Sequence, residues 1–168
     1  MPCSTRLAAA VRRLARCAPA LVALAWASCS APAATTIEHI NPASMYQSPA
    51  FSQAVTVSGP HTTVYVGGQN AVAADGTIVG ARDLAAQTKQ VARNLKTVLA
   101  ASGATPSDVI QWTVALVEGQ SPRIAFAAFE EELGPASPPP TVLVLYVPAL
   151  AHPEFLLEVS AIAVVPAR

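Results

Sequence analysis

The sequence predicts an α+β fold in which two helices cover one face of a mixed β-sheet. Short runs of β-type alternation and two longer segments of helical periodicity predict it, in the order strand pair, helix, strand, helix, strand, strand. The chain has 168 residues, 52% of them hydrophobic and 12% charged, which suits a single domain with a short N-terminal appendage.

The first 33 residues have the layout of a secretory signal peptide. Four arginines and no acidic residue lie before Ala18. An apolar run then extends from Ala18 to Ala27, and a stretch of small residues ends with Ala31-Pro32-Ala33. A run of about ten apolar residues is too short to span a bilayer. We therefore expect cleavage after Ala33, a mature domain of residues 34–168, and a periplasmic or secreted protein.

The cysteines add an alternative and an exclusion. Ala27-Ser28-Cys29 resembles the end of a bacterial lipoprotein signal, so a lipid anchor on Cys29 is the alternative, and membrane association is expected only in that case. Cys3, Cys17 and Cys29 are the only cysteines. Cleavage after Ala33 would leave a domain with no disulfide, thiolate metal site or cysteine nucleophile.

Removal of this segment also changes the charge. Four of the ten basic residues lie in it and none of the ten acidic ones, so the mature domain has six basic and ten acidic residues, a net charge of −4. An acidic domain without a basic cluster is a poor nucleic-acid binder, so we expect no nucleic-acid partner.

The mature domain begins with a proline-containing loop and two strand-like runs, Ser52 to Val57 and Thr62 to Gly67. Turn-forming residues fill the link Ser58-Gly59-Pro60-His61, so we expect the two runs to pair as a hairpin. Asp75-Gly76 then predicts a tight turn between short extended pieces.

The segment from Asp83 to Ser102 is the clearest helix. Asp83 can cap its start and Gly103 can end it. Its apolar face, at spacings of seven, four and three, is formed by Leu84, Val91, Leu95 and Val98. A basic stripe on the other side, Lys89, Arg93 and Lys96, is expected to face solvent.

A buried strand and a second helix follow. Val109 to Val117 predicts the strand, with one face formed by Ile110, Trp112, Val114 and Leu116. Ser121-Pro122 is a favourable helix start, and the helix should continue from Arg123 to Leu133 and end at Gly134. The acidic triplet Glu130-Glu131-Glu132 is expected on its solvent side.

Two strands close the chain, Thr141 to Val147 and Phe155 to Val165, and both are apolar on both faces. Glu158 is the one carboxylate inside the last strand, and an acidic group is seldom placed there unless it is paired or used. Two helices can cover only one face of the sheet. A second copy of the protein is therefore expected to cover the other, in a closed homo-oligomer.

Stock catalytic motifs are absent. The chain contains no G-x-S-x-G, H-E-x-x-H, P-loop or G-x-G-x-x-G pattern. His39, His61 and His152 lie far apart in loop-like sequence, so no shared metal site is expected, and nothing in the sequence indicates a cofactor.

Six segments of the mature domain together carry a resemblance to a known family: Ala50 to Val55, Gly67-Gly68-Gln69, Gln87-Thr88 with Asn94 to Leu99, Val109 to Val117, Phe129-Glu130, and Glu158 to Ala163. In this order they resemble the RidA family of enamine and imine deaminases, also called YjgF. The resemblance covers nearly the whole mature domain. It implies a chorismate-mutase-like α+β fold, a homotrimer, and ligand clefts between subunits.

The resemblance also implies site residues, several of which depart from the family pattern. A glutamate like Glu158 helps to position the attacking water in the family's deaminases. Their arginine, which binds the substrate carboxylate, corresponds to Pro139 in the segment that ends at Thr141. Phe51 stands where the family has tyrosine, Gly67 where it often has serine, and Phe126 where it often has asparagine. The expected ligand is therefore neutral or cationic.

Two hypotheses follow. In the first, an exported trimer binds a small molecule in an intersubunit cleft, with hydrolytic deamination of an imine or enamine by Glu158 as its reaction. In the second, the trimer is a non-catalytic binding or structural protein of the cell envelope. The loss of the arginine leaves open which of the two applies, and so whether the protein is an enzyme.

Overall fold

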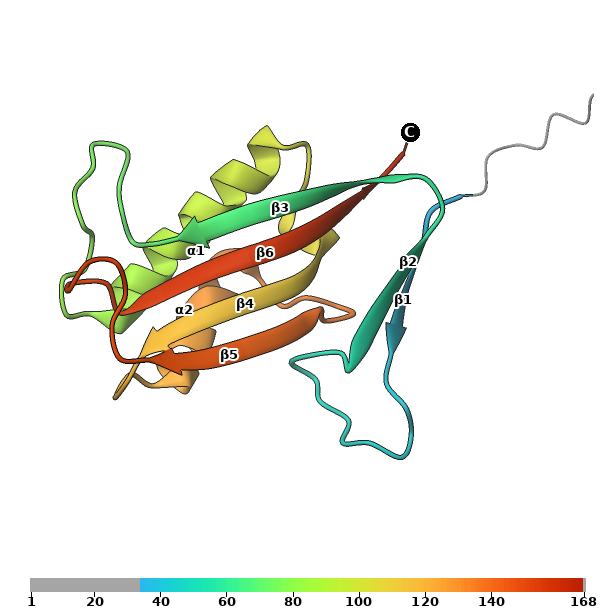
Figure 1. Cartoon of the computed structure of the whole chain (residues 1–168), viewed down its shortest axis with the longest axis horizontal. Helices are drawn as coiled ribbons and strands as arrows, with labels where there is room; N and C mark the ends of the chain where they lie inside the picture. The colour runs from blue at the N-terminus through green and yellow to red at the C-terminus, as the bar shows by residue number, and fades with distance from the viewer. Residues whose placement is uncertain (1–33, 168) are drawn as a thin grey trace, which may run out of the picture. The chain divides into compact units, whose positions relative to one another are not determined.

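The computed structural model describes residues 34–167, and the expectations for residues 1–33 lie outside them. Its main sheet has four strands in the order β3-β6-β4-β5, where β3 is His61–Gln69, β6 is Leu157–Pro166, β4 is Val109–Val117 and β5 is Thr141–Val147. β4 and β5 run parallel, and the other two pairs are antiparallel. Helices α1, Leu84–Ala101, and α2, Pro122–Leu133, lie behind the same face of this sheet (Figure 1). The predicted α+β fold with a mixed sheet is therefore confirmed.

The predicted hairpin between β2, Ala54–Ser58, and β3 is wrong. β2 pairs instead with β1, Thr36–Ile40, as a separate two-stranded sheet, so the prediction of one sheet is also wrong. The carbonyl of Pro60, in the link between β2 and β3, accepts hydrogen bonds from Thr35 and Ala167. The segment Ser58 to His61 does change the direction of the chain, as its turn residues predict. Its hydrogen bonds to Thr35 and Ala167, however, make it a corner between two sheets and not the turn of a hairpin.

Both helix starts and ends follow the sequence signals. Asp83 caps α1 by accepting a hydrogen bond from the backbone N–H of Ala86 at 3.0 Å. Gly103 and Gly134, with φ angles of 75° and 78°, follow the two helices in a conformation that favours glycine. Ser121 occupies the N-cap position of α2, although its side chain makes no capping bond.

A β-bulge in β4 corrects the predicted face of this strand. The register with β6 shifts between Val109 and Gln111, so Val109, and not Ile110, joins Trp112 in the core. The rest of the core lies between the helices and β6, where alternate strand residues are buried: Leu157, Val159, Ala161 and Ala163.

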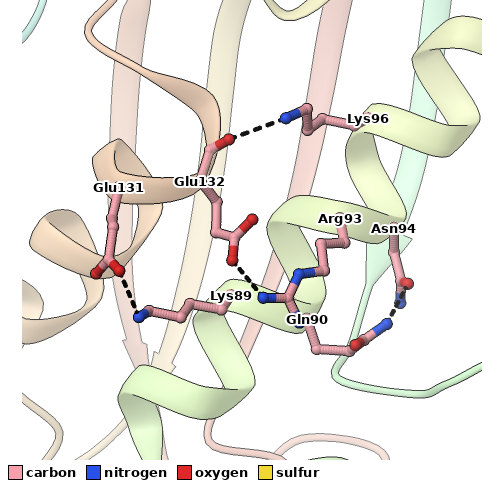
Figure 2. Close-up of polar contacts among 7 residues, drawn as sticks. All are labelled: Lys89, Gln90, Arg93, Asn94, Lys96, Glu131 and Glu132. Carbon is pink, nitrogen blue, oxygen red and sulfur yellow. Dashed lines mark hydrogen bonds and ion pairs between the residues drawn. The ribbon is translucent and has the colours of Figure 1, made fainter.

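The basic stripe of α1 is solvent-exposed at Arg93 and Lys96, as expected, but it also contacts α2, which the sequence pattern did not predict. Lys89 Nζ lies 2.8 Å from Glu131 Oε1, and Arg93 pairs with the carboxylate of Glu132. Lys96 Nζ donates to the backbone carbonyl of Glu132 at 3.0 Å. Figure 2 shows the three basic side chains directed at the acidic end of α2. Each pattern by itself resembles a solvent face, and only the packing of the two helices brings the opposite charges together.

The face of the sheet away from the helices has no cover within residues 34–167. Leu143 and Leu145 of β5 are 48% and 45% exposed, and Tyr65 of β3 projects almost fully into solvent. β5 is also exposed on its helix side, at Val142, Val144 and Tyr146. The expectation that the helices cover only one face is therefore confirmed. No helix of the described region is long and apolar enough to cross a membrane.

Candidate functional site

A cavity of about 400 Å³ lies on the helix side of the sheet, between α2, strands β4 and β5, and the loop from Gly134 to Pro140. Its inner wall is formed by strand residues that include Trp112, Val114, Val142 and Val144. Small residues of α2, Ala125 and Ala128, are buried and bring this helix close to the sheet. The Phe129 ring stands at 86° to that of Trp112, with centroids 5.1 Å apart, an edge-to-face arrangement that fixes both rings.

Three of the predicted ligand-binding residues line this cavity together. Phe51 reaches it from the loop before β2, Phe126 from α2, and Pro139 from the proline-rich loop. These residues are distant in sequence, and only the fold brings them to one place. The aromatic and proline side chains give this part of the cavity an apolar wall.

Hydrogen bonds to the Pro139 and Pro140 carbonyls anchor the proline-rich loop to β1 and to the segment before β2. The backbone N–H of Ser52 donates to the Pro140 carbonyl at 2.9 Å, and the Ser52 hydroxyl donates to the Pro139 carbonyl. His39 Nδ1 lies 2.9 Å from the same Pro139 carbonyl. A carbonyl oxygen only accepts, so the tautomer protonated at Nδ1 makes this bond. The main chain at position 139 is thus held whatever side chain it carries.

Glu158 lies on the opposite face of the sheet from the cavity. Its neighbours in the strand, Leu157 and Val159, line the cavity, and strand alternation directs Glu158 away from them. The Asn70 side chain donates to Glu158 Oε2 at 3.2 Å. A Cβ built on Gly68 would lie 2.0 Å from Glu158 Oε1, so the carboxylate occupies the space that a side chain at position 68 would need.

Gly67 and Thr141 lie outside the cavity. Gly67 precedes the glycine that Glu158 contacts, and a Cβ at position 67 would meet nothing within 4 Å. The Thr141 hydroxyl donates to the Ile110 carbonyl at 3.1 Å, which ties the start of β5 to β4. A single chain therefore presents two separate groups of predicted residues: Phe51, Phe126 and Pro139 at the cavity, and Glu158 with the Gly67-Gly68 pair on the far face.

The charges at the cavity are few. Among residues 34–167, Glu130 and His39 are the only ionisable residues that line it, and no lysine or arginine of this region does. In residues 34–167 no group of three potential metal ligands is close enough to hold an ion. The sequence pattern predicts Glu130 on the solvent side of α2 and Trp112 on a buried strand face. Neither pattern indicates that both residues line one cavity.

Comparison with known proteins identifies the family. The model of the family described as endoribonuclease L-PSP matches residues 42–165, which is most of the chain and includes both groups of site residues. The chain belongs to the Rid (YjgF/YER057c/UK114) family. No curated protein sequence matches it significantly.

Solved structures of Rid-family proteins agree with this assignment. YyfB of Yersinia pestis, a Rid protein of unknown function, is 39% identical over 76% of this chain and 97% of its own, with a TM-score of 0.64. A Mycobacterium tuberculosis member is 27% identical over 68% of this chain and 86% of its own, with a TM-score of 0.52. RidA from an Antarctic Psychrobacter is 24% identical over 70% of this chain and 95% of its own, with a TM-score of 0.54, and shows the shared fold alone.

Proposed function

We propose that this Rid protein is an exported homotrimer that binds a small neutral or cationic molecule between subunits. The cavity that Phe51, Phe126 and Pro139 line would form one side of each site, and the Glu158 face of a neighbouring copy would form the other. The observation that carries the proposal is the placement of these two groups on opposite faces of one sheet. Within a single chain they cannot act on one molecule, whereas the cavity side of one copy, packed against the Glu158 face of the next, can join them.

The exposed strand β5 supports assembly. The apolar side chains of β5 are exposed on both faces of the sheet. This strand directly follows the loop that borders the cavity. A contiguous apolar surface of this kind on a soluble protein usually marks an interface. A neighbouring copy that covers it would also close the cavity mouth.

The chemistry that this arrangement allows is hydrolysis of an imine. A water oxygen would attack the C=N carbon while the Glu158 carboxylate accepts one of its protons. Return of that proton to nitrogen would give a carbinolamine, and transfer of its hydroxyl proton to nitrogen as the C–N bond breaks would release ammonia and leave a carbonyl compound. No metal or redox partner is needed, because the reaction only adds water and expels ammonia.

A carboxylate-bearing substrate fits the cavity poorly. Pro139 has no donor side chain, and no lysine or arginine of residues 34–167 lines the wall. A buried carboxylate without a charged partner loses several kcal/mol relative to one bound by arginine. We therefore expect deamination of 2-iminopropanoate to be at least about 100-fold slower than in an arginine-containing relative, which corresponds to roughly 3 kcal/mol.

Ammonia release from 2-iminopropanoate and from the imine of a neutral ketone tests the proposal. Turnover of the neutral imine that falls in the Glu158→Gln variant would support the hydrolytic function. Fast turnover of 2-iminopropanoate would contradict the proposed ligand class. If neither imine is hydrolysed faster by the protein than by Glu158→Gln, the non-catalytic envelope protein becomes the better hypothesis, which the Asn70 hydrogen bond to Glu158 also favours.

A ribonuclease function, which the description of the family model suggests, is not the one we propose. Residues 34–168 carry six basic and ten acidic residues, and three of the basic ones already contact α2. Binding of a nucleic-acid backbone depends on accessible basic groups.

A further inference from the structure

We propose that the cavity binds an aromatic ring compound without an anionic group, and that Phe126 determines this specificity. The inference rests on the proposed function, in which this cavity is one side of the ligand site. Three features of the described residues lead to it: the size of the cavity, the aromatic side chains around it, and the sign of its charges.

The size is suitable for a ring with a substituent. Apolar cavities of about 150 Å³ in proteins bind benzene, and ligand pockets generally begin at about 300 Å³. At about 400 Å³, this cavity has space for a substituted ring or a bicyclic compound. The Trp112 and Phe129 rings pack edge to face at the inner wall, so two contacting aromatic side chains shape this side of the cavity.

The walls favour an aromatic ligand over an aliphatic one. Phe51, Phe126, Trp112 and Phe129 all line the cavity, so a ring inside it can pack against aromatic side chains. An aromatic pair strengthens binding about two- to tenfold beyond the effect of the area it buries. Phe126 is 46% exposed on α2, where its side chain can contact a ligand without being needed for the core.

The charges select against anions. Glu130 lines the cavity, and within residues 34–167 no lysine or arginine lines it. The nearby basic residues of α1 are engaged by α2, since Lys89 pairs with Glu131 and Arg93 with Glu132. A ligand carboxylate would therefore be desolvated beside another carboxylate, whereas a hydroxyl or ammonium group would not meet this repulsion.

Calorimetry with four related probes tests the inference on the full chain: benzyl alcohol, benzylamine, benzoate and cyclohexylmethanol. We expect benzyl alcohol and benzylamine to bind at least tenfold more tightly than benzoate. Cyclohexylmethanol should bind about two- to tenfold more weakly than benzyl alcohol, the range that corresponds to the aromatic contribution. Equal binding of benzoate, or tighter binding of the cyclohexyl compound, would overturn the proposal.

A pair of variants locates the site. Phe126→Ala should weaken benzyl alcohol binding at least fivefold, whereas Ile124→Ala should leave it unchanged, because Ile124 is similarly exposed on α2 but does not line the cavity. The chain has two tryptophans, so a Trp26→Phe background leaves Trp112 as the only one. A saturable change in Trp112 fluorescence on titration with benzyl alcohol would then show that the compound binds at the cavity wall. Unchanged binding in Phe126→Ala would refute the role of this residue.

The two proposals fail separately. If no ring probe binds but a small acyclic imine is hydrolysed in a Glu158-dependent reaction, the aromatic specificity is wrong and the proposed function stands. If the ring probes bind as expected but no imine is hydrolysed in a Glu158-dependent reaction, the specificity stands and the catalytic function is wrong.

Discussion

Position 139 separates what a side chain does from what its backbone does. The Pro139 carbonyl accepts the hydrogen bonds from Ser52 and His39 that anchor the proline-rich loop, and any residue at this position could supply it. At position 139, only the side chain affects the charge of the ligand that the cavity can bind. A proline in place of the arginine that the resemblance implies therefore alters which molecules the cavity can bind while the anchor of the loop is retained.

Glu158 and Gly68 offer a direct test at the same scale. The Gly68→Ala substitution places a methyl group in the space of the Glu158 side chain, which must move and give up its hydrogen bond from Asn70, so we expect the free energy of unfolding to fall by about 0.5–1.5 kcal/mol. In a Glu158→Ala background the cost should nearly vanish, because the clashing atoms are gone.

Urea unfolding of the two single variants and the double variant measures this coupling. Gly67→Ala is the matched control, since its added Cβ would meet nothing within 4 Å and should bring no steric cost. Equal destabilisation by Gly68→Ala with and without the Glu158 side chain would show that the carboxylate does not fill this space.

At the scale of elements, a single buried glutamine joins α1 to the segment before β6. The Gln87 amide nitrogen donates to the Glu154 carbonyl at 2.7 Å and to the Gly80 carbonyl at 3.2 Å. Its Oε1 accepts from the Leu156 N–H at 2.9 Å. The side chain is fully buried, so these bonds replace the pairing that a regular strand would give this part of the backbone.

Removal of these bonds should be costly. Gln87→Ala removes the partners of the Glu154 carbonyl and the Leu156 N–H and leaves a gap at a fully buried position, so we expect a loss of about 2–3 kcal/mol in the free energy of unfolding. Gln90→Ala is the control one turn along, where the amide only bonds to Asn94 within the helix, and it should cost less than about 0.5 kcal/mol. Thermal unfolding at equal protein concentration compares them, and similar losses for both would exclude the bridging role.

For the whole molecule, the open question is what covers β5 and the sheet face beside it. We expect wild-type protein to give three times the chain mass in light scattering, because a trimer can cover the apolar side chains that the two helices leave exposed. Leu145→Glu should shift the protein to lower mass, since it places a charge in that surface.

Thr97→Glu serves as the control for assembly. Thr97 is exposed on α1, which covers the opposite face of the sheet, so this substitution should leave the mass unchanged. A monomer mass for the wild-type protein would remove the intersubunit site from the proposed function.

Much of the local structure could be predicted from the sequence. β4 and β5 begin and end where their apolar runs do, and α1 lies between its aspartate cap and its glycine stop. These signals act over a few residues, because capping bonds, glycine conformations and strand alternation depend on near neighbours. Of the site, the sequence and its resemblance named Phe51, Phe126, Pro139 and Glu158, and the first three do line one cavity.

The tertiary structure decided what depends on distant partners. It paired β2 with β1, shifted the register of β4 at a bulge, and joined the basic stripe of α1 to the glutamates of α2. It also placed Trp112 and Phe129 in the cavity wall and Glu158 on the other face. Local patterns could not predict these features, because the free energy that selects a strand partner or shapes a cavity comes from burial between segments far apart in the chain.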